Sequence, residues 1–181
     1  MKNKVLAKRY AKALFAVGKE ENVLDEYSGN LAEIVEAMKS TPEITDALIN
    51  PMYPVEAKEK VMEHLAGAMK ASKIMKNFLT LLVQKKRADV LPEIAEVFQD
   101  LVDDAANISR GTVVSATELN SDLNDKVKAT LEKITGKKVV LQNVVDSSII
   151  GGIVAKVGDL VLDGSIKSQL KGLKESIKGS E

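Results

Sequence analysis

The stretch that decides the fold of the C-terminal region reads Gly151-Gly152-Ile-Val-Ala-Lys-Val-Gly158-Asp159-Leu-Val-Leu-Asp163-Gly164-Ser165-Ile166. Two short alternating runs flank Gly158-Asp159, a dipeptide suited to a two-residue hairpin turn that needs positive φ. The apolar spacing then changes to steps of three and four residues, and Ser165 can accept a hydrogen bond from the first turn of a new helix. The stretch therefore predicts a strand–turn–strand–helix module. It shows no catalytic or metal-binding arrangement, which favours a structural or binding role.

The residues before this module belong to the same small α+β region. Residues 112–117 are rich in β-branched side chains and predict a strand. Residues 121–135 carry a helical apolar stripe that Gly136 ends, and residues 138–146 predict a second strand. The architecture changes near residues 107–111, so we expect one domain over 1–107 and a second over 108–181.

The N-terminal domain has helical periodicity throughout. Thr41-Pro42 predicts a helix start with proline in the first turn, and the prolines of Asn50-Pro51-Met-Tyr-Pro54 predict a turn. The expected helices cover about 4–19, 23–39, 42–49, 55–69, 73–86 and 91–108. The predicted fold is therefore an all-α N-terminal six-helix bundle followed by a small α+β C-terminal domain.

The first and fifth of these helices are apolar over too wide an arc for simple surface helices. The first carries one stripe of Leu6, Tyr10, Ala13, Leu14 and Val17, and a second stripe of Ala7, Ala11, Phe15 and Gly18. The fifth carries Ile74, Met75, Phe78, Leu79, Leu81, Leu82 and Val83. Either these helices are buried centrally in the bundle, or a partner helix packs on their outer side.

The composition argues against several classes of function. The 26 basic and 26 acidic residues cancel, and aromatic residues make up only 3%, so nucleic-acid binding is not expected. The chain has no cysteine, which excludes disulfides, thiolate metal sites and cysteine nucleophiles. Basic residues interrupt the apolar run that a secretory signal would need near the N-terminus, and no stretch approaches the ~18–20 apolar residues that span a bilayer. We expect no direct membrane insertion.

No enzyme-like constellation emerges. His64 is the only histidine and has no partner at ligand spacing. Gly136-Lys137-Lys138 lacks the flanking residues of a phosphate-binding loop, and Gly151-Gly152 has the wrong spacing for a dinucleotide fingerprint. The acidic residues of 93–104 are interpreted as a solvated helix face. We therefore predict no catalytic residue, no cofactor and no metal site.

With both halves in view, the chain resembles the F-type ATP synthase δ family, the bacterial counterpart of the oligomycin-sensitivity-conferring protein, over nearly its full length. The matching motifs are Arg9-Tyr10-Ala-Lys-Ala-Leu14-Phe15, Asn77-Phe78-Leu79 through Leu82, Lys86, Arg87 and Leu91-Pro92, and the C-terminal signature. That signature is its most specific part and consists of Gly151, Gly152, Gly158, Asp159, Asp163, Gly164 and Ser165, followed by Leu170.

The resemblance implies a non-catalytic stator subunit of a proton-translocating ATP synthase, present in one copy per complex. In this family the six-helix bundle binds the N-terminal helix of an α subunit in a groove between its first and fifth helices. The C-terminal domain binds the b subunits, so that the peripheral stalk resists rotor torque during ATP synthesis. The residues expected to line the groove are Ala7, Tyr10, Ala11, Leu14, Phe15, Gly18, Met75, Phe78, Leu79 and Leu82.

This interpretation places the protein peripherally at the cytoplasmic face of the bacterial plasma membrane, within the F1Fo complex. The alternative is a free helical adaptor that binds amphipathic helices outside any membrane complex. A third hypothesis, an enzyme on an α+β scaffold, would require substrate-dependent turnover by the pure protein.

Overall fold

The computed structural model describes residues 2–146, 149, 151–158 and 160–170, and the chain forms two compact units, Met1–Val102 and Asp103–Glu181. The boundary falls a few residues before the one expected from the sequence. Asp103 lies in the last turn of a helix but pairs with Arg110 in the following strand at 2.5 Å. This ion pair ties that last turn to the second unit.

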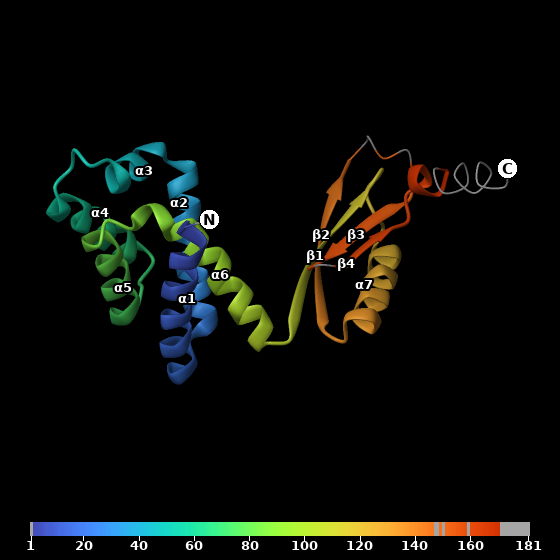
Figure 1. The fold of residues 1–181 in the computed structure, drawn as a ribbon, viewed down its shortest axis with the longest axis horizontal. Coiled ribbons are helices and arrows are strands. Elements are labelled where there is room, and N and C mark those ends of the chain that lie inside the picture. Colours follow the sequence, from blue (N-terminus) through green and yellow to red (C-terminus); the bar gives the residue numbers. More distant parts are fainter. Residues whose placement is uncertain (1, 147–148, 150, 159, 171–181) are drawn as a thin grey trace. The chain divides into compact units, whose positions relative to one another are not determined.

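The first unit is a bundle of six α-helices. They are α1 (Lys2–Glu21), α2 (Leu24–Ser40), α3 (Pro42–Ile49), α4 (Val55–Ala68), α5 (Lys73–Gln84) and α6 (Leu91–Ala105), with a 3₁₀ turn, η1 (Ala88–Val90), before α6 (Figure 1). The predicted fold class, a six-helix bundle followed by a small α+β domain, is confirmed.

Four of the helices are followed closely by a residue other than glycine in the left-handed region. These residues are Asn22, Lys70, Lys86 and Asn107, with φ between 52° and 58°. The sequence predicted that the last helix continues to Ile108, which is wrong: α6 ends at Ala105, and Ile108 starts a strand. Asn107 turns the chain there, and its carbonyl accepts a hydrogen bond from the Lys138 amide at 3.0 Å.

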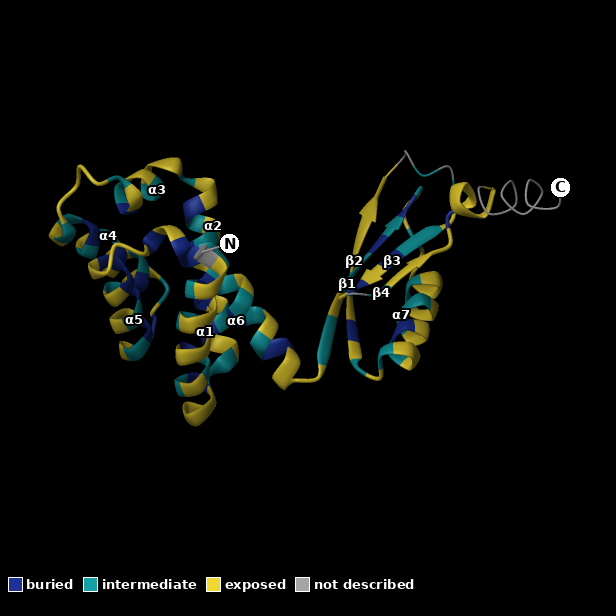
Figure 2. Cartoon of the chain, in the orientation of Figure 1, coloured by how far each residue is buried: buried dark blue, intermediate teal, exposed yellow. Residues whose placement is uncertain are grey.

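The core of the bundle draws on all six helices. Its largest side chains without solvent exposure include Tyr27, Ile34 and Phe98, while Ala7 and Ala11 allow neighbouring helices to approach α1 closely. Figure 2 shows buried stretches of the helices facing the inside of the bundle and exposed stretches facing outward. The bundle is therefore built around a single apolar core.

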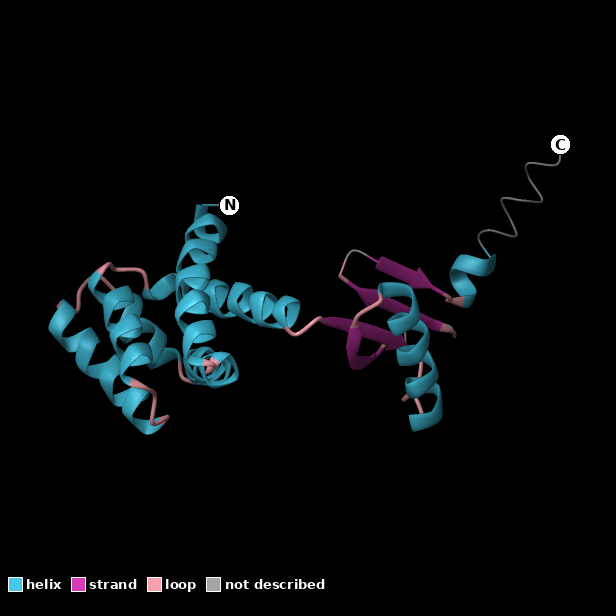
Figure 3. Ribbon diagram, turned by 90° about the horizontal axis from the view of Figure 1, so that it is seen from below, coloured by secondary structure: helices cyan, strands magenta, loops and turns pink. Residues whose placement is uncertain are grey.

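In the described part of the second unit, a four-stranded sheet is accompanied by helix α7 and, after the last strand, by helical residues 166–170. Its elements are β1 (Ile108–Ser115), α7 (Ser121–Thr135), β2 (Lys138–Val145), β3 (Ile153–Val157) and β4 (Leu160–Asp163), and the strand order is β2-β1-β3-β4. β1 and β2 are parallel, and the other two pairs are antiparallel. Figure 3 shows α7 lying across the sheet.

The first strand differs from its predicted range of 112–117. It begins at Ile108, because Ile108 already pairs with Lys138 of β2, and it ends at Ser115, which pairs with Val145. The limits of α7 agree with the prediction. The Asn120 side chain accepts a hydrogen bond from the Leu123 amide, and Gly136 ends the helix with φ of 66°.

The two faces of the sheet differ in burial. The face against α7 contains the small core of this unit, formed by Val113, Leu131, Val139, Ala155 and Val157. The strand pairing places Val114, Val140, Val144, Val154 and Val161 on the opposite face. Three of these valines, Val140, Val144 and Val161, are 39–54% exposed. This second face is accessible, and it combines a row formed by Val144, Val114 and Val154 with polar residues such as Gln142 and Lys156.

Candidate partner-binding surface

Helices α1 and α5 meet through two aromatic rings. The ring centroids of Tyr10 and Phe78 lie 6.3 Å apart with an interplanar angle of 73°, an edge-to-face contact. Both rings are only partly buried, so they lie at the edge of the bundle core. This contact identifies which flank of α1 faces α5.

Apolar side chains extend along both helices on that flank. With 100° between successive helical residues, Leu6, Ala13 and Val17 lie beside Tyr10, and Ile74 and Leu81 lie beside Phe78. We call these residues the α1–α5 strip: Leu6, Tyr10, Ala13 and Val17 of α1, and Ile74, Phe78 and Leu81 of α5. Ala13 and Leu81 are exposed and the other five are half-buried. The strip therefore exposes apolar surface that a partner helix can contact.

The residues predicted from the sequence to line a groove fall into three groups. Six pack into the bundle's own core at 0–3% exposure: Ala7, Ala11, Leu14, Met75, Leu79 and Leu82. Gly18 is also buried, and a Cβ there would lie 3.0 Å from atoms of Leu24 and Tyr27, so it allows α2 to approach α1. Only Tyr10, Phe15 and Phe78 retain accessible surface.

Phe15 lies on the other flank of α1. Its ring packs edge-to-face against Phe98 of α6, with centroids 6.3 Å apart. Tyr10 and Phe78 are therefore in contact with each other, whereas Phe15 contacts α6 on a different side of α1. The strip residues Leu6, Ala13, Val17, Ile74 and Leu81 were not among the predicted lining residues. For α1, the signal was the stripe that Leu6, Ala13 and Val17 form with Tyr10 at three- and four-residue steps.

The described residues of the glycine-rich signature lie at turns and at close approaches of the chain. β3 and β4 are joined by a two-residue turn with Gly158 at φ of 57°, and Val157 pairs with Leu160 across it. Asp159 lies outside the described residues. Gly152 has φ of 87°, and a Cβ there would overlap the carbonyl oxygen of Gly164. Glycine is needed at 152 both for the backbone angle and for the close approach of the chain.

The end of the signature caps a helix. Ser165 accepts a hydrogen bond from the Ser168 amide at 3.3 Å, which confirms its predicted role. The Asp163 carboxylate accepts hydrogen bonds from the Ser168 hydroxyl at 2.6 Å and from the Ser165 amide at 2.9 Å. The Ser168 hydroxyl, followed by the Ser165 side chain and amide, lowers the pKa of Asp163. These groups hold the chain as it leaves β4 and enters helical residues 166–170.

The described part of the chain contains neither a metal-ligand cluster nor a helix that could span a membrane. Within it, no three His, Asp or Glu side chains gather as a metal-ligand group, and His64 is exposed on α4. None of the described helices combines the length and apolar character needed to cross a membrane.

Comparison with known proteins agrees with this architecture. The family model described as ATP synthase delta (OSCP) subunit matches residues 6–177. An "ATP synthase subunit delta" from Desulfotalea psychrophila is 58% identical over 181 residues, covering 100% of both chains. Another from Desulfosudis oleivorans is 46% identical, covering 100% of this chain and 99% of the relative.

A solved structure, the Toxoplasma gondii mitochondrial ATP synthase hexamer, contains a chain similar to this one. The TM-score is 0.70 at 27% identity, and the match covers 95% of this chain and 97% of that chain. Full-length agreement in sequence and fold leads to one conclusion. This chain belongs to the ATP synthase delta (OSCP) subunit family, whose members are structural, non-catalytic subunits of the peripheral stalk.

Proposed function

We propose that the helical unit binds the N-terminal helix of an α subunit along the α1–α5 strip, and that the α+β unit binds the b subunits. The chain would then join the F1 head to the peripheral stalk and help hold the head against rotor torque. Similar chains are named as ATP synthase subunits or found in an ATP synthase structure, which supports association with that complex. The proposal that the helical unit binds the α subunit rests on the partly exposed apolar side chains of the α1–α5 strip, which includes Tyr10 and Phe78.

The charges around the strip indicate which helix fits it. The α5 sequence contains no acidic residue, and α1 contains none before Glu20. Arg9 is an exposed cation next to the strip, since it lies 100° from Tyr10 on the side away from the core. A complementary partner is an amphipathic helix whose apolar stripe covers the strip and whose flanks are acidic.

Binding of a synthetic α-subunit N-terminal peptide to the full chain, measured by calorimetry, tests this surface. Ala13→Glu and Leu81→Glu place a charge on exposed strip positions, so the bundle stays folded while the apolar contact is lost. We expect each to weaken binding at least about tenfold, as for central residues of a protein interface. Ala32→Glu, at an exposed position of α2, is the matched control and should bind like the unaltered chain. Unchanged affinity in both strip variants would contradict the proposal that the α-subunit peptide binds along the strip.

The open face of the sheet supports the proposal for the b subunits. Val144 of β2, Val114 of β1 and Val154 of β3 are paired neighbours on this face and form an apolar row that a helix can cover. Val144→Lys should reduce co-purification of the full chain with the b subunits. Val145→Lys is the control, because Val145 is the next residue of β2, is 53% exposed and belongs to the other face. Equal loss in both variants would contradict the assignment of this face.

The proposed location is the cytoplasmic side of the bacterial plasma membrane, where the chain is held by its partners. The competing function is a free adaptor for amphipathic helices, which the exposed strip alone would also fit. Pull-down from detergent-solubilised membranes separates the two. The stator proposal predicts recovery of ATP synthase subunits with the tagged chain, and their absence would favour the adaptor.

A further inference from the structure

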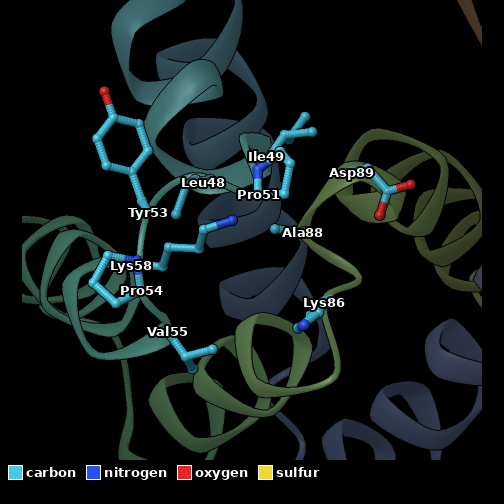
Figure 4. Close-up of a pocket in the computed structure, with 10 residues that line it drawn as sticks. All are labelled: Leu48, Ile49, Pro51, Tyr53, Pro54, Val55, Lys58, Lys86, Ala88 and Asp89. Carbon is cyan, nitrogen blue, oxygen red and sulfur yellow. The ribbon is translucent and has the colours of Figure 1, made fainter.

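A pocket of about 520 Å³ opens in the helical unit. None of its lining residues belongs to the α1–α5 strip. Figure 4 shows its walls, which come from the end of α3, the turn at 50–54, the start of α4 and the segment 86–89. The lining residues are Leu48, Ile49, Pro51, Tyr53, Pro54, Val55, Lys58, Lys86, Ala88 and Asp89. Its volume lies within the roughly 300–1,000 Å³ that is common for ligand sites. Most of the wall is apolar, and its charged residues are Lys58, Lys86 and Asp89.

Lys58 is the unusual residue of this pocket. It is 9% exposed, and Figure 4 shows its side chain extending from α4 into the pocket between the α3 wall and Ala88. Within the described part of the chain, its ammonium has no hydrogen-bond acceptor and no carboxylate within ion-pair distance. Asp89 lines the pocket, but Figure 4 shows its carboxylate directed away from Lys58. The Lys58 ammonium therefore reaches the accessible space of the pocket as an unpaired positive charge that a ligand can contact.

The start of α4 contributes backbone amides to the pocket wall, and its first turn also carries one acidic residue, Glu56. Pro54 is the N-cap residue and offers no side-chain acceptor to the first turn. Its carbonyl accepts hydrogen bonds from the amides of Ala57 and Lys58, at 3.1 and 3.3 Å, while no described acceptor pairs with the amide of Val55. The amino end of a helix favours an anion. Lys86 lies at the exposed rim and carries a further positive charge.

The mouth of the pocket is apolar and exposed. Ile49 is 43% exposed, Tyr53 is 46% exposed, and Met52 in the same turn is 85% exposed. Aromatic residues and methionine gathered at an accessible site are typical of protein interfaces. A free small anion would use the charges inside the pocket but would leave this rim uncovered.

We propose that this pocket binds an acidic side chain of a partner polypeptide, with the carboxylate at Lys58 and its apolar neighbours on Ile49, Met52 and Tyr53. The proposal goes beyond the function proposed above, because no lining residue comes from α1 and only Lys86, after the end of α5, lies close to the strip in sequence. It defines a second recognition point on the helical unit, specific for a glutamate or aspartate between apolar residues.

Nuclear magnetic resonance titration of the full chain provides the test, with an acetylated, amidated Leu-Glu-Leu tripeptide as the probe. We expect saturable shifts of the Val55, Glu56 and Lys58 amides. The matching Leu-Gln-Leu peptide should bind at least about tenfold more weakly, since it lacks the charge that strengthens the hydrogen bond to an ammonium. Sodium acetate should also bind more weakly than the glutamate peptide, because it cannot cover the apolar rim.

Lys58→Met keeps the length and the apolar stem of the side chain, and should abolish the preference for glutamate over glutamine. Lys60→Met, two residues further on the exposed side of α4, should keep that preference. Equal binding of both peptides, a preference that survives in Lys58→Met, or no saturable shift with the glutamate peptide would overturn the proposal. Acetate binding as tightly as the peptide would assign the pocket to a free carboxylate instead. None of these results depends on the α1–α5 strip, so the two proposals fail independently.

Discussion

The two units of this chain bury apolar surface on different scales. The helical unit builds its core from all six helices, around large residues such as Tyr27 and Phe98. The described core of the α+β unit consists of Val113, Leu131, Val139, Ala155 and Val157. Turn and cap residues, such as Gly152 and Asp163, therefore have a larger share in shaping the second unit. Because the core of the helical unit is larger, this unit can remain folded while the α1–α5 strip stays partly exposed for a partner.

The largest expected effect is a charge placed inside the large core. Ala11→Glu puts a carboxylate at a position with no solvent exposure, and should destabilise the helical unit by more than about 4 kcal/mol. Circular dichroism during thermal unfolding measures this loss. Ala13→Glu, two residues away and exposed, should keep nearly the unaltered melting temperature. Similar melting of the two variants would contradict the assignment of one position to the core and the other to the strip.

A cavity in the small core should have an effect confined to the α+β unit. Leu131 is 1% exposed, and Leu131→Ala should cost about 2–5 kcal/mol. Hydrogen exchange should accelerate in β1, β2 and β3, while amides of α1–α6 keep their protection. Leu123→Ala on the same helix is the control, since Leu123 is 48% exposed. Loss of protection in both units would show that they do not unfold separately.

A methyl group at the tightest turn should have an intermediate effect. Gly152→Ala combines a left-handed backbone with overlap on Gly164, and should destabilise the α+β unit by about 1–3 kcal/mol. Gly29→Ala should act in the opposite direction, because Gly29 lies within α2 and a Cβ added there would meet nothing within 4 Å. That change should stabilise the helical unit by about 0.5–1 kcal/mol. Denaturant unfolding followed by circular dichroism compares the two, and the same sign for both would contradict the account.

Some limits of the elements could be predicted from the sequence, and others could not. The limits of α7 were predictable because Asn120 and Gly136 act within a few residues of the helix ends. The end of α6 was not, because the turn at Asn107 is completed by the distant Lys138 amide. The two stripes of α1 were visible as well, but only packing decides which is accessible. Ala7, Ala11 and Gly18 of the second stripe are buried, whereas Leu6, Tyr10 and Val17 of the first are half-buried and Ala13 is exposed.

The Lys58 pocket could not be found from the sequence. Lys58 has the appearance of an ordinary surface lysine of a helix rich in charged residues. Its burial depends on α3, on the turn at 50–54 and on the segment 86–89, which come together only in the folded bundle. No local periodicity indicates such a site, since its walls come from separate segments.

The smallest expected effect concerns pH and the cap after β4. Hydrogen bonds from Ser168 and Ser165 lower the pKa of Asp163 below its ordinary value of 3.8. The folded state therefore favours the carboxylate. Its stabilisation is complete above that ordinary value and is lost as pH falls through the lowered pKa. Carbon-detected titration should show the lowered pKa, which should rise in Ser168→Ala. An unchanged pKa in that variant would contradict the role of the Ser168 hydroxyl.

The central claim, that the α-subunit helix lies along the α1–α5 strip, can be tested most directly by cross-linking in the assembled enzyme. A photoreactive phenylalanine derivative replaces Leu81 in one version of the chain and Ala32 in another, and each is incorporated into ATP synthase in membranes. We predict a cross-link to the α subunit from position 81 and none from position 32. A cross-link to the α subunit from position 32 without one from position 81 would contradict the account.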